Sequence, residues 1–198
     1  MKKEQKKQPT REKLLDITFE EVYIYGYAST SVDAILKKAK VPKGSMYHHF
    51  KSKKELVLAM VEERLFVKMD SFFKYELEDG KSVTYSFRKT FVSIAKNKLL
   101  ITYGCPLYRL MVELSATDKE FDALLSAKAS QMQEGIKSLL EKGIEIKEYN
   151  KDLDTEAFSG YLLSAVWGIL SLSPTLSSSK NFMNQSKYIL KELENYKS

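Results

Sequence analysis

The sequence predicts an all-α fold. Apolar residues recur at helical spacing along nearly the whole chain, whereas no strand-like alternation of useful length and no internal repeat is visible. Only eight Gly and four Pro punctuate 198 residues, too few for the many turns of a β-sandwich or barrel. With 43% hydrophobic and 29% charged residues, the composition is that of a folded, soluble chain, long enough for one compact domain or two small ones.

The first predicted helix covers about 11–25. Leu15, Phe19 and Val22 fall at positions i, i+4 and i+7, so they share one face. Thr10 is the expected N-cap, and Gly26 is expected to stop the helix.

Two short helices follow, over 31–39 and about 43–50. Ser31 is the expected N-cap of the first, and a turn at 40–42 separates the two. The run Ser52-Lys53-Lys54-Glu55 then matches a capping box before an apolar segment, which predicts a helix that continues to about residue 75.

The rest of the chain predicts five more helices, giving about nine in all, with Gly or Pro between them. Their expected ranges are 82–97, 106–116, 118–143, 154–173 and 180–196. We expect a domain at 1–55, with 1–8 as a flexible arm, and a second domain at 56–198, linked by the helix that begins at about 52.

The positive charge lies at one end of the chain. Residues 1–55 hold thirteen Lys and Arg against seven Asp and Glu, an excess that equals the net charge of +6 for all 198 residues. Such asymmetry favours a polyanionic partner for this segment, nucleic acid before a membrane surface.

Two observations bear on location. The uncharged stretch 157–179 contains seven Ser and a Pro, so it predicts a helix buried against protein rather than in a membrane. One cysteine excludes an intrachain disulfide, and the Lys-rich N-terminus lacks the apolar run of a secretory signal. We therefore expect a cytoplasmic protein without a membrane partner.

Two short helices joined by a tight turn, between two further helices, are typical of a helix-turn-helix. Seven lysines and no acidic residue occur from Lys37 to Lys54. Apolar side chains can pack the short helices together, which leaves Lys43, Ser45, Tyr47, His48 and His49 for the outer surface or the edge of the domain.

The residues of this segment resemble the N-terminal domain of TetR-type transcriptional regulators. The resemblance covers about residues 10–60 and is carried by the run Ser31-Val32-x-x-Ile35…Ala39-x-Val41-x-Lys43-Gly44-Ser45-Met46-Tyr47-His48-His49-Phe50-x-Ser52-Lys53-x-x-Leu56. Further along, Gly104-Cys105-Pro106-Leu107 followed by Glu113 resembles one subgroup of the family.

The resemblance implies a homodimer that reads a palindromic operator in double-stranded DNA, most simply a repressor released by a small-molecule effector. Residues 43–49 would enter the major groove, with Lys43 and Gly44 nearest the base edges and Ser45 reaching a base or a phosphate. Tyr47, His49 and Lys53 would contact phosphates, with Ser31 beside the DNA backbone. His48 belongs to the same DNA-binding surface, and phosphate contact and simple exposure both stay open for the two histidines.

Two residues depart from the family pattern. Lys40 stands where a glycine is usual, at a position that often needs a positive φ. Pro42 replaces a usual serine and removes a side-chain cap from the third helix.

Simpler interpretations of several of these residues also stay open. Tyr47 could be a packing residue, and the arm with Lys2, Lys3, Lys6 and Lys7 could be solvated or enter a minor groove. His48 and His49 are adjacent on a helix and point about 100° apart, which disfavours a shared metal ion. We predict no metal and no cofactor.

The second domain is rich in aromatic residues, which predicts either an effector cavity for an apolar or aromatic molecule or an ordinary core. The candidate cavity residues are Phe87, Phe91, Tyr103, Cys105, Tyr108, Met111, Phe121, Met132, Tyr161 and Trp167. A stripe of small residues, Gly160, Ser164 and Gly168, permits close approach of another helix. It could be an intrachain contact, whereas the resemblance implies a dimer contact.

Cys105 precedes Pro106, which suits the first turn of a helix, so the thiol is expected at or near an N-cap. There it is either a reactive thiolate favoured by the helix dipole or, as the preferred alternative, a buried inert side chain.

No glycine-rich phosphate loop, two-histidine metal motif or nucleophile–base pair is visible, so we predict no enzyme. The rival interpretations are an all-α enzyme or carrier with a basic N-terminal bundle and a nonspecific nucleic-acid-binding protein.

Overall fold

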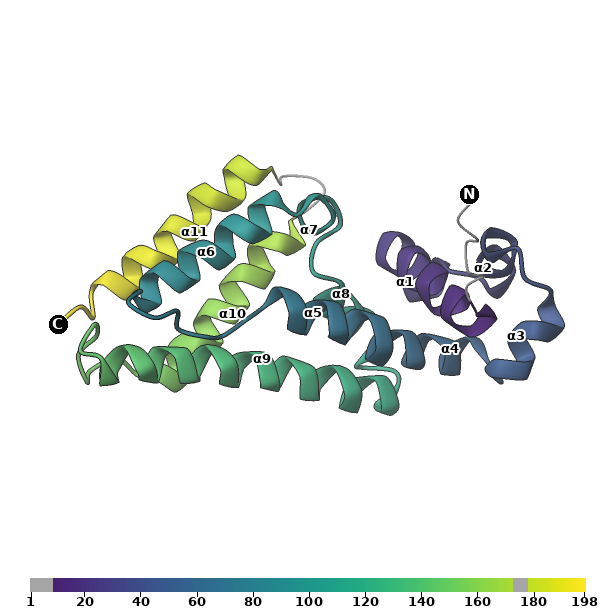
Figure 1. Cartoon of the computed structure of the whole chain (residues 1–198), viewed down its shortest axis with the longest axis horizontal. Helices are drawn as coiled ribbons and strands as arrows, with labels where there is room; N and C mark the ends of the chain where they lie inside the picture. The colour runs from purple at the N-terminus through teal and green to yellow at the C-terminus, as the bar shows by residue number, and fades with distance from the viewer. Residues whose placement is uncertain (1–8, 173–177) are drawn as a thin grey trace, which may run out of the picture. The chain divides into compact units, whose positions relative to one another are not determined.

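The computed structural model describes residues 9–172 and 178–198. Within these residues every regular element is helical, apart from one isolated antiparallel bridge between Tyr149 and Lys197, so the all-α prediction is confirmed (Figure 1). The chain divides into two compact units, Met1–Phe72 and Phe73–Ser198. The division comes later than the predicted boundary after residue 55, and both the predicted arm at 1–8 and the predicted helix end near Pro174 lie outside the described residues.

The first unit consists of one long helix, two short ones and a final helix in three segments. The segments are α1 (Thr10–Ser29), α2 (Val32–Ala39), α3 (Lys43–His49), α4 (Lys53–Met60), the π-helix η1 (Val61–Phe66) and α5 (Val67–Phe72). The last three follow one another without a break. The helix that was predicted to reach residue 75 therefore ends at Phe72.

The two ends of α1 differ in how well they were predicted. Thr10 is the first helical residue and not the cap, because Pro9 takes the N-cap position, without a side-chain hydrogen bond. Gly26 interrupts the helical backbone with φ 83° and ψ 172°, a conformation open almost only to glycine. One further turn then follows, to Ser29.

Charged side chains tie α1 to η1. Arg11 donates two hydrogen bonds to the Glu63 carboxylate, at 2.5 and 2.7 Å, and this pairing lowers the pKa of Glu63. Arg64 donates to Asp16 at 2.5 Å and also to Glu12. A guanidinium held by two carboxylates fixes the rotation of η1 against α1.

The described residues of the second unit form six helices. They are α6 (Val83–Lys96), α7 (Lys98–Tyr103), α8 (Pro106–Leu114), α9 (Lys119–Glu145), α10 (Thr155–Ser171) and α11 (Ser179–Glu194). The sequence did not predict α7. Asn97 ends α6 and at the same time caps α7, since its side chain accepts a hydrogen bond from the Leu100 amide at 3.1 Å.

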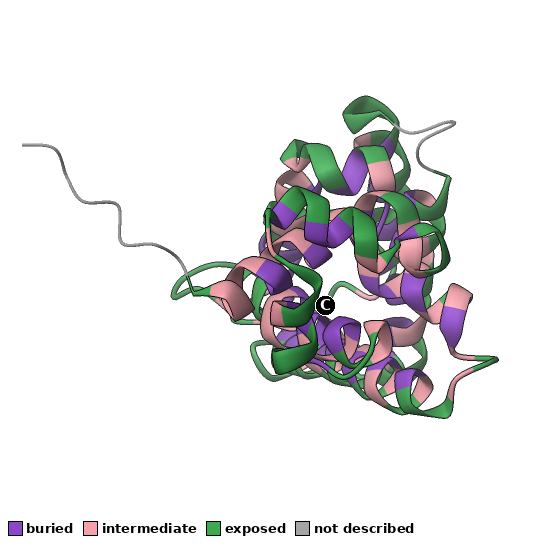
Figure 2. Cartoon of the chain, turned by 90° about the vertical axis from the view of Figure 1, so that its right-hand side faces the viewer, coloured by how far each residue is buried: buried purple, intermediate pink, exposed green. Residues whose placement is uncertain are grey.

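Helix α9 packs against α8 and α10, while α6 and α11 lie side by side (Figure 1). Buried residues gather on the inner sides of the helices and exposed ones on the outer sides (Figure 2). At the end of α9, Gly143 leaves room for the buried Tyr149 ring, whose hydroxyl lies 2.8 Å from that of Thr84. The neighbouring Glu148 accepts hydrogen bonds from the first amides of α6, so this turn holds α6 to α9.

The turn between α2 and α3 agrees with its sequence. The Ser31 hydroxyl accepts a hydrogen bond from the Ala34 amide at 3.1 Å, which confirms the cap of α2. Lys40 adopts φ 53° and ψ 46°, the left-handed conformation expected at this position. Pro42 occupies the N-cap of α3 and makes no side-chain cap bond there.

Because a lysine in the left-handed region is strained, Lys40→Gly should raise the free energy of unfolding by roughly 1 kcal/mol. Lys40→Ala keeps a Cβ and should give no such gain. Urea denaturation of the three proteins measures the difference. Equal effects of the two substitutions would show that backbone strain is absent.

Candidate functional site

The rotation of α3 is set by two buried apolar residues. Met46 and Phe50, four positions apart, are buried in the first unit, and the Phe50 amide donates to the Met46 carbonyl at 2.9 Å. The other side of the helix is therefore open to solvent. It carries the residues predicted to contact DNA: Lys43, Gly44, Tyr47, His48 and His49 are exposed, and Ser45 is half-buried.

Because Gly44 has no side chain, the backbone of α3 is accessible on its exposed face. A Cβ built at this position would have no heavy atom within 4 Å. The backbone is thus open to close approach from outside, as the edge of a base in a groove would require. Tyr47 is 49% exposed, which disfavours its interpretation as a core residue.

Lys43 and Lys53 both have partners within the unit. The Lys43 ammonium lies 3.6 Å from the exposed Asp33 carboxylate. The Lys53 ammonium donates to the Tyr27 carbonyl at 2.6 Å and lies 4.2 Å from the centroid of the Tyr27 ring. Lys53 is thereby held at a fixed place in the first turn of α4.

The start of α4 has the predicted cap. The Ser52 hydroxyl accepts from the Glu55 amide at 3.1 Å, and the Glu55 carboxylate accepts from the Lys51 amide at 2.8 Å. In the predicted capping box the carboxylate would have bonded the amide of Ser52, one residue later. Lys53 stands in the first turn of α4, at the positive end of the helix dipole.

The rings of the two histidines of α3 lie edge to face, with centroids 5.3 Å apart and planes at 68°. In the described part of the chain, no group of three or more His, Cys, Asp or Glu side chains is arranged to hold a metal ion.

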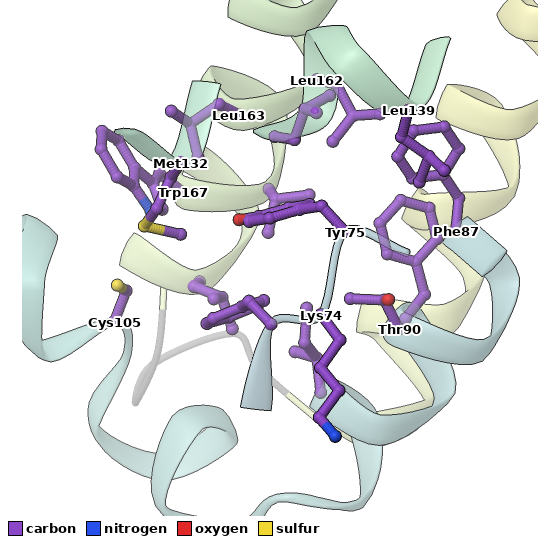
Figure 3. A pocket seen from close by; sticks show the side chains of 16 residues that line it. Lys74, Tyr75, Phe87, Thr90, Cys105, Met132, Leu139, Leu162, Leu163 and Trp167 are labelled. Atoms are coloured by element: carbon purple, nitrogen blue, oxygen red, sulfur yellow. The ribbon is translucent and has the colours of Figure 1, made fainter. Parts of the chain in front are cut away.

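The second unit contains an apolar cavity between its helices, with about 550 Å³ of empty space including the part that opens to solvent (Figure 3). Among the side chains that line it, only that of Lys74 carries a charge, and Figure 3 shows its amine directed away from the others. The described residues that line it are Phe73, Lys74, Tyr75, Phe87, Thr90, Phe91, Ile94, Cys105, Met132, Ile136, Leu139, Leu162, Leu163, Val166, Trp167 and Leu170.

Half of the residues predicted for an effector cavity line this one: Phe87, Phe91, Cys105, Met132 and Trp167. The other five do not line it. Phe121 is fully buried in the core elsewhere on α9, and Tyr161 is 45% exposed on the outside of α10. Tyr108 does not line the cavity, but its ring centroid lies 5.4 Å from that of Trp167, which does. Tyr103 and Met111 are partly exposed and do not reach the cavity.

The sequence analysis missed two kinds of cavity residue. Aliphatic residues such as Leu139 and Leu162 are buried like any core residue, so nothing in the sequence distinguishes them. Phe73 and Tyr75 were assigned to a helix, yet they lie in the non-helical connection between α5 and α6. The acidic and glycine-containing run Glu78-Asp79-Gly80 was the only signal of that connection.

Cys105 occupies the N-cap of α8, as predicted, and is 4% exposed. Burial raises the pKa of its thiol, while the nearby Tyr108 and Leu107 amides and the Trp167 side chain act in the opposite direction, although the thiol makes no cap hydrogen bond. The neutral thiol is therefore favoured, which supports the buried, inert interpretation over the reactive thiolate.

The three small residues of the predicted stripe on α10 differ in their surroundings. Ser164 and Gly168 are exposed, and a Cβ on Gly168 would meet nothing within 4 Å. Gly160 instead faces its own chain, since a Cβ there would lie 3.4 Å from the Gln133 side chain of α9. In the described residues, no helix is long and apolar enough to span a membrane.

Comparisons with known proteins agree with both units. Residues 14–60 match the family model described as bacterial regulatory proteins, tetR family, and residues 86–185 match the tetracyclin repressor-like C-terminal domain. A crystal structure of a TetR transcriptional regulator from Chloroflexus aurantiacus superposes with a TM-score of 0.83 at 22% identity, covering 95% of this chain and 96% of that one.

Two curated relatives extend the likeness in sequence. An uncharacterized HTH-type transcriptional regulator of Lactococcus lactis is 32% identical over 64% of this chain and 66% of its own length. The transcriptional regulator AcuR of Cereibacter sphaeroides is 30% identical over 72% of this chain and 64% of its own. The chain thus spans just under two thirds of the length of these relatives. Since both of its units match the family's own domains, the chain belongs to the TetR family of bacterial transcriptional regulators.

Proposed function

We propose that the protein is a homodimeric repressor that binds a palindromic operator through α3 and is released when a small apolar molecule enters the cavity of the second unit. The observation that carries the proposal is the outward face of α3. Burial of Met46 and Phe50 turns Lys43, Gly44 and Tyr47 to solvent in a segment with a large excess of lysine. DNA, and not a membrane, is the polyanion that fits a short helix of this kind.

The side chains divide between base and backbone contacts. Lys43 and the open backbone at Gly44 suit the acceptor atoms of base edges, and Ser45 suits a base or a phosphate. Tyr47, His48, His49 and Lys53 suit phosphates. Ser31, whose hydroxyl already caps α2, suits a position beside the DNA backbone.

A selection from random duplex DNA tests this function. The full chain should enrich an inverted repeat whose half-sites lie roughly 34–36 Å apart, one helical turn, or a multiple of it. Uniform affinity for all sequences would instead support a nonspecific nucleic-acid-binding protein. Turnover of a small molecule without DNA binding would support an all-α enzyme or carrier.

Gly44→Ala separates DNA contact from folding. A Cβ at this position meets nothing in the free protein, so the variant should be as stable as the wild type, or more stable by up to about 1 kcal/mol. Its affinity for the selected operator should fall about tenfold or more, roughly 1.4 kcal/mol, because the methyl group would hold the helix away from the bases. Unchanged affinity would remove Gly44 from the interface.

Lys53→Ala tests the backbone contacts. If both subunits lose one phosphate contact, the slope of log affinity against log salt should become less steep by about 2, at roughly 0.9 per phosphate. Lys151→Ala, an exposed lysine of the second unit, is the control and should leave the slope unchanged. Since Lys53 also bonds the Tyr27 carbonyl, thermal unfolding of the variant must be compared as well. A wild-type slope in a folded Lys53→Ala protein would contradict the assignment.

Dimerisation is proposed to use α10 and α11. One face of α10 and the residue after it is exposed without a charge, at Ala157, Tyr161, Ser164, Gly168 and Leu172. On α11, Tyr188 is 71% exposed. An uncharged exposed stripe with small residues suits close pairing of two helices, and the symmetry mates of α10 and α11 would complete a four-helix interface.

Gly168→Leu should weaken the dimer by about 1–3 kcal/mol, because the larger side chain forces the paired helices apart. Glu141→Leu places the same side chain on an exposed position of α9 and should have no effect. Sedimentation equilibrium measures both. A wild-type monomer at micromolar concentration, or equal dimer affinities in the two variants, would refute this interface.

A further inference from the structure

We propose that the effector is an uncharged molecule with an aromatic ring, and that it binds by taking the place of the Tyr75 ring, which occupies part of the cavity in the free protein. The inference rests on the proposed function for the identity of the cavity as an effector site, and it adds the chemical class of the ligand and the residue with which that ligand competes.

The first observation is the position of the Tyr75 ring. Tyr75 lies among the cavity side chains, and its hydroxyl is directed toward the side where Cys105, Met132 and Trp167 lie (Figure 3). The ring rests on the backbone of α9 at Gly135, where a Cβ would lie only 2.7 and 2.9 Å from the ring atoms Cγ and Cε2. Only glycine leaves room for an aromatic ring at this place.

The second observation is the segment that carries the ring. Residues 73–82 form neither helix nor strand, whereas the other cavity residues belong to helices, apart from Cys105 at the N-cap of α8. Leaving the cavity would therefore cost Tyr75 its side-chain contacts but no helical backbone hydrogen bonds. Among the cavity's aromatic residues, Phe87, Phe91 and Trp167 are held within α6 and α10, so they lack this freedom.

The third observation is that Lys74 carries the one charged side chain among the described lining residues. The amine of Lys74 is exposed and directed away, and the Thr90 hydroxyl donates to the Ser86 carbonyl of its own helix at 3.1 Å. The Cys105 thiol is neutral because burial raises its pKa. A carboxylate or an ammonium group inside would lose its hydration without gaining a partner of opposite charge, so an uncharged ligand is favoured.

The aromatic preference follows from what the ring of Tyr75 already does there. Space that accepts a planar ring over Gly135, near Phe87 and Trp167, will accept a planar ring from a ligand. Tyr75 also stands three residues after Phe72, the last residue of α5 and of the first unit. Displacing its ring must change the connection that follows the proposed DNA-binding unit.

A matched pair of fluorescent probes tests the ligand class. N-phenyl-1-naphthylamine is uncharged and aromatic, and 8-anilino-1-naphthalenesulfonate has the same ring skeleton with a sulfonate. The full-length protein should bind the uncharged probe about tenfold more tightly than the anionic one, a difference of roughly 1.4 kcal/mol. Equal affinities, or a preference for the sulfonate, would overturn the uncharged class.

Variants of Tyr75 test the competition. If the ring fills the site most of the time, apparent affinity is reduced by the fraction of open protein, so Tyr75→Ala should bind the uncharged probe about tenfold more tightly than the wild type. Tyr75→Phe keeps the ring and should stay within about twofold of the wild type. Tyr85→Ala, which removes a partly exposed tyrosine of α6 that does not line the cavity, is the control. Unchanged or weaker binding by Tyr75→Ala would make Tyr75 a wall of the site and not its occupant.

The wild-type protein provides a second readout that does not depend on the fold of a variant. With saturating uncharged probe, backbone amides of residues 73–82 should exchange with deuterium faster, because the segment is released from the cavity. Slower or unchanged exchange would overturn the displacement. No DNA is present in these measurements, so loss of the proposed operator binding would not alter their outcome, nor would their failure refute the operator-binding function.

Discussion

The burial of Met46 and Phe50 is the constraint on which the proposed DNA-binding surface depends. A helix of only seven residues has too few backbone hydrogen bonds to be stable alone, so contacts with the rest of the unit must hold α3 in place. Two apolar residues four positions apart do this and also fix its rotation. Once these two face inward, Gly44, Tyr47 and His48 lie about 100° or more around the helix from Met46 and face outward. The buried apolar contacts of α3 thus determine where its polar side chains lie.

The neighbouring polar contacts refine that arrangement. The left-handed Lys40 lets the chain turn sharply between α2 and α3, and the Tyr27 carbonyl and ring hold Lys53 at the start of α4. Tyr27 comes directly after Gly26, whose unusual backbone conformation ends the regular part of α1. A break in one helix therefore supplies the carbonyl that orients a lysine of another.

In the second unit, by contrast, the helices leave part of the apolar interior unfilled. Close packing is the rule in protein cores, and empty apolar space costs stability through lost contacts. Here Gly135 admits a ring from the connection after α5, and Tyr75 fills part of the space. Because Tyr75 lies on a non-helical segment, its ring can leave the cavity and return. This suits a site that must be open to a ligand part of the time.

Local rules made much of this fold predictable, and long-range packing explains the rest. The cap at Ser31, the positive φ at Lys40 and the uncapped Pro42 depend on neighbours in sequence, and each was predicted. The missed α7 also has a local signal, the Asn97 cap, but its six residues are too few for a clear periodicity. The cavity is different. Phe121 and Met132 both belong to the buried face of α9, and only the course of the other helices and of residues 73–82 decides that Met132 lines the cavity while Phe121 does not.

The operator and the cavity ligand should each weaken the protein's binding of the other. A complete thermodynamic cycle tests this most directly. Operator affinity is measured with and without saturating N-phenyl-1-naphthylamine, and the affinity for that probe is measured with and without saturating operator. Because linkage between two binding sites is reciprocal, both affinities should fall by the same factor, about 5–150-fold for a typical coupling of 1–3 kcal/mol. Affinities that are independent of each other would show that the cavity does not control DNA binding.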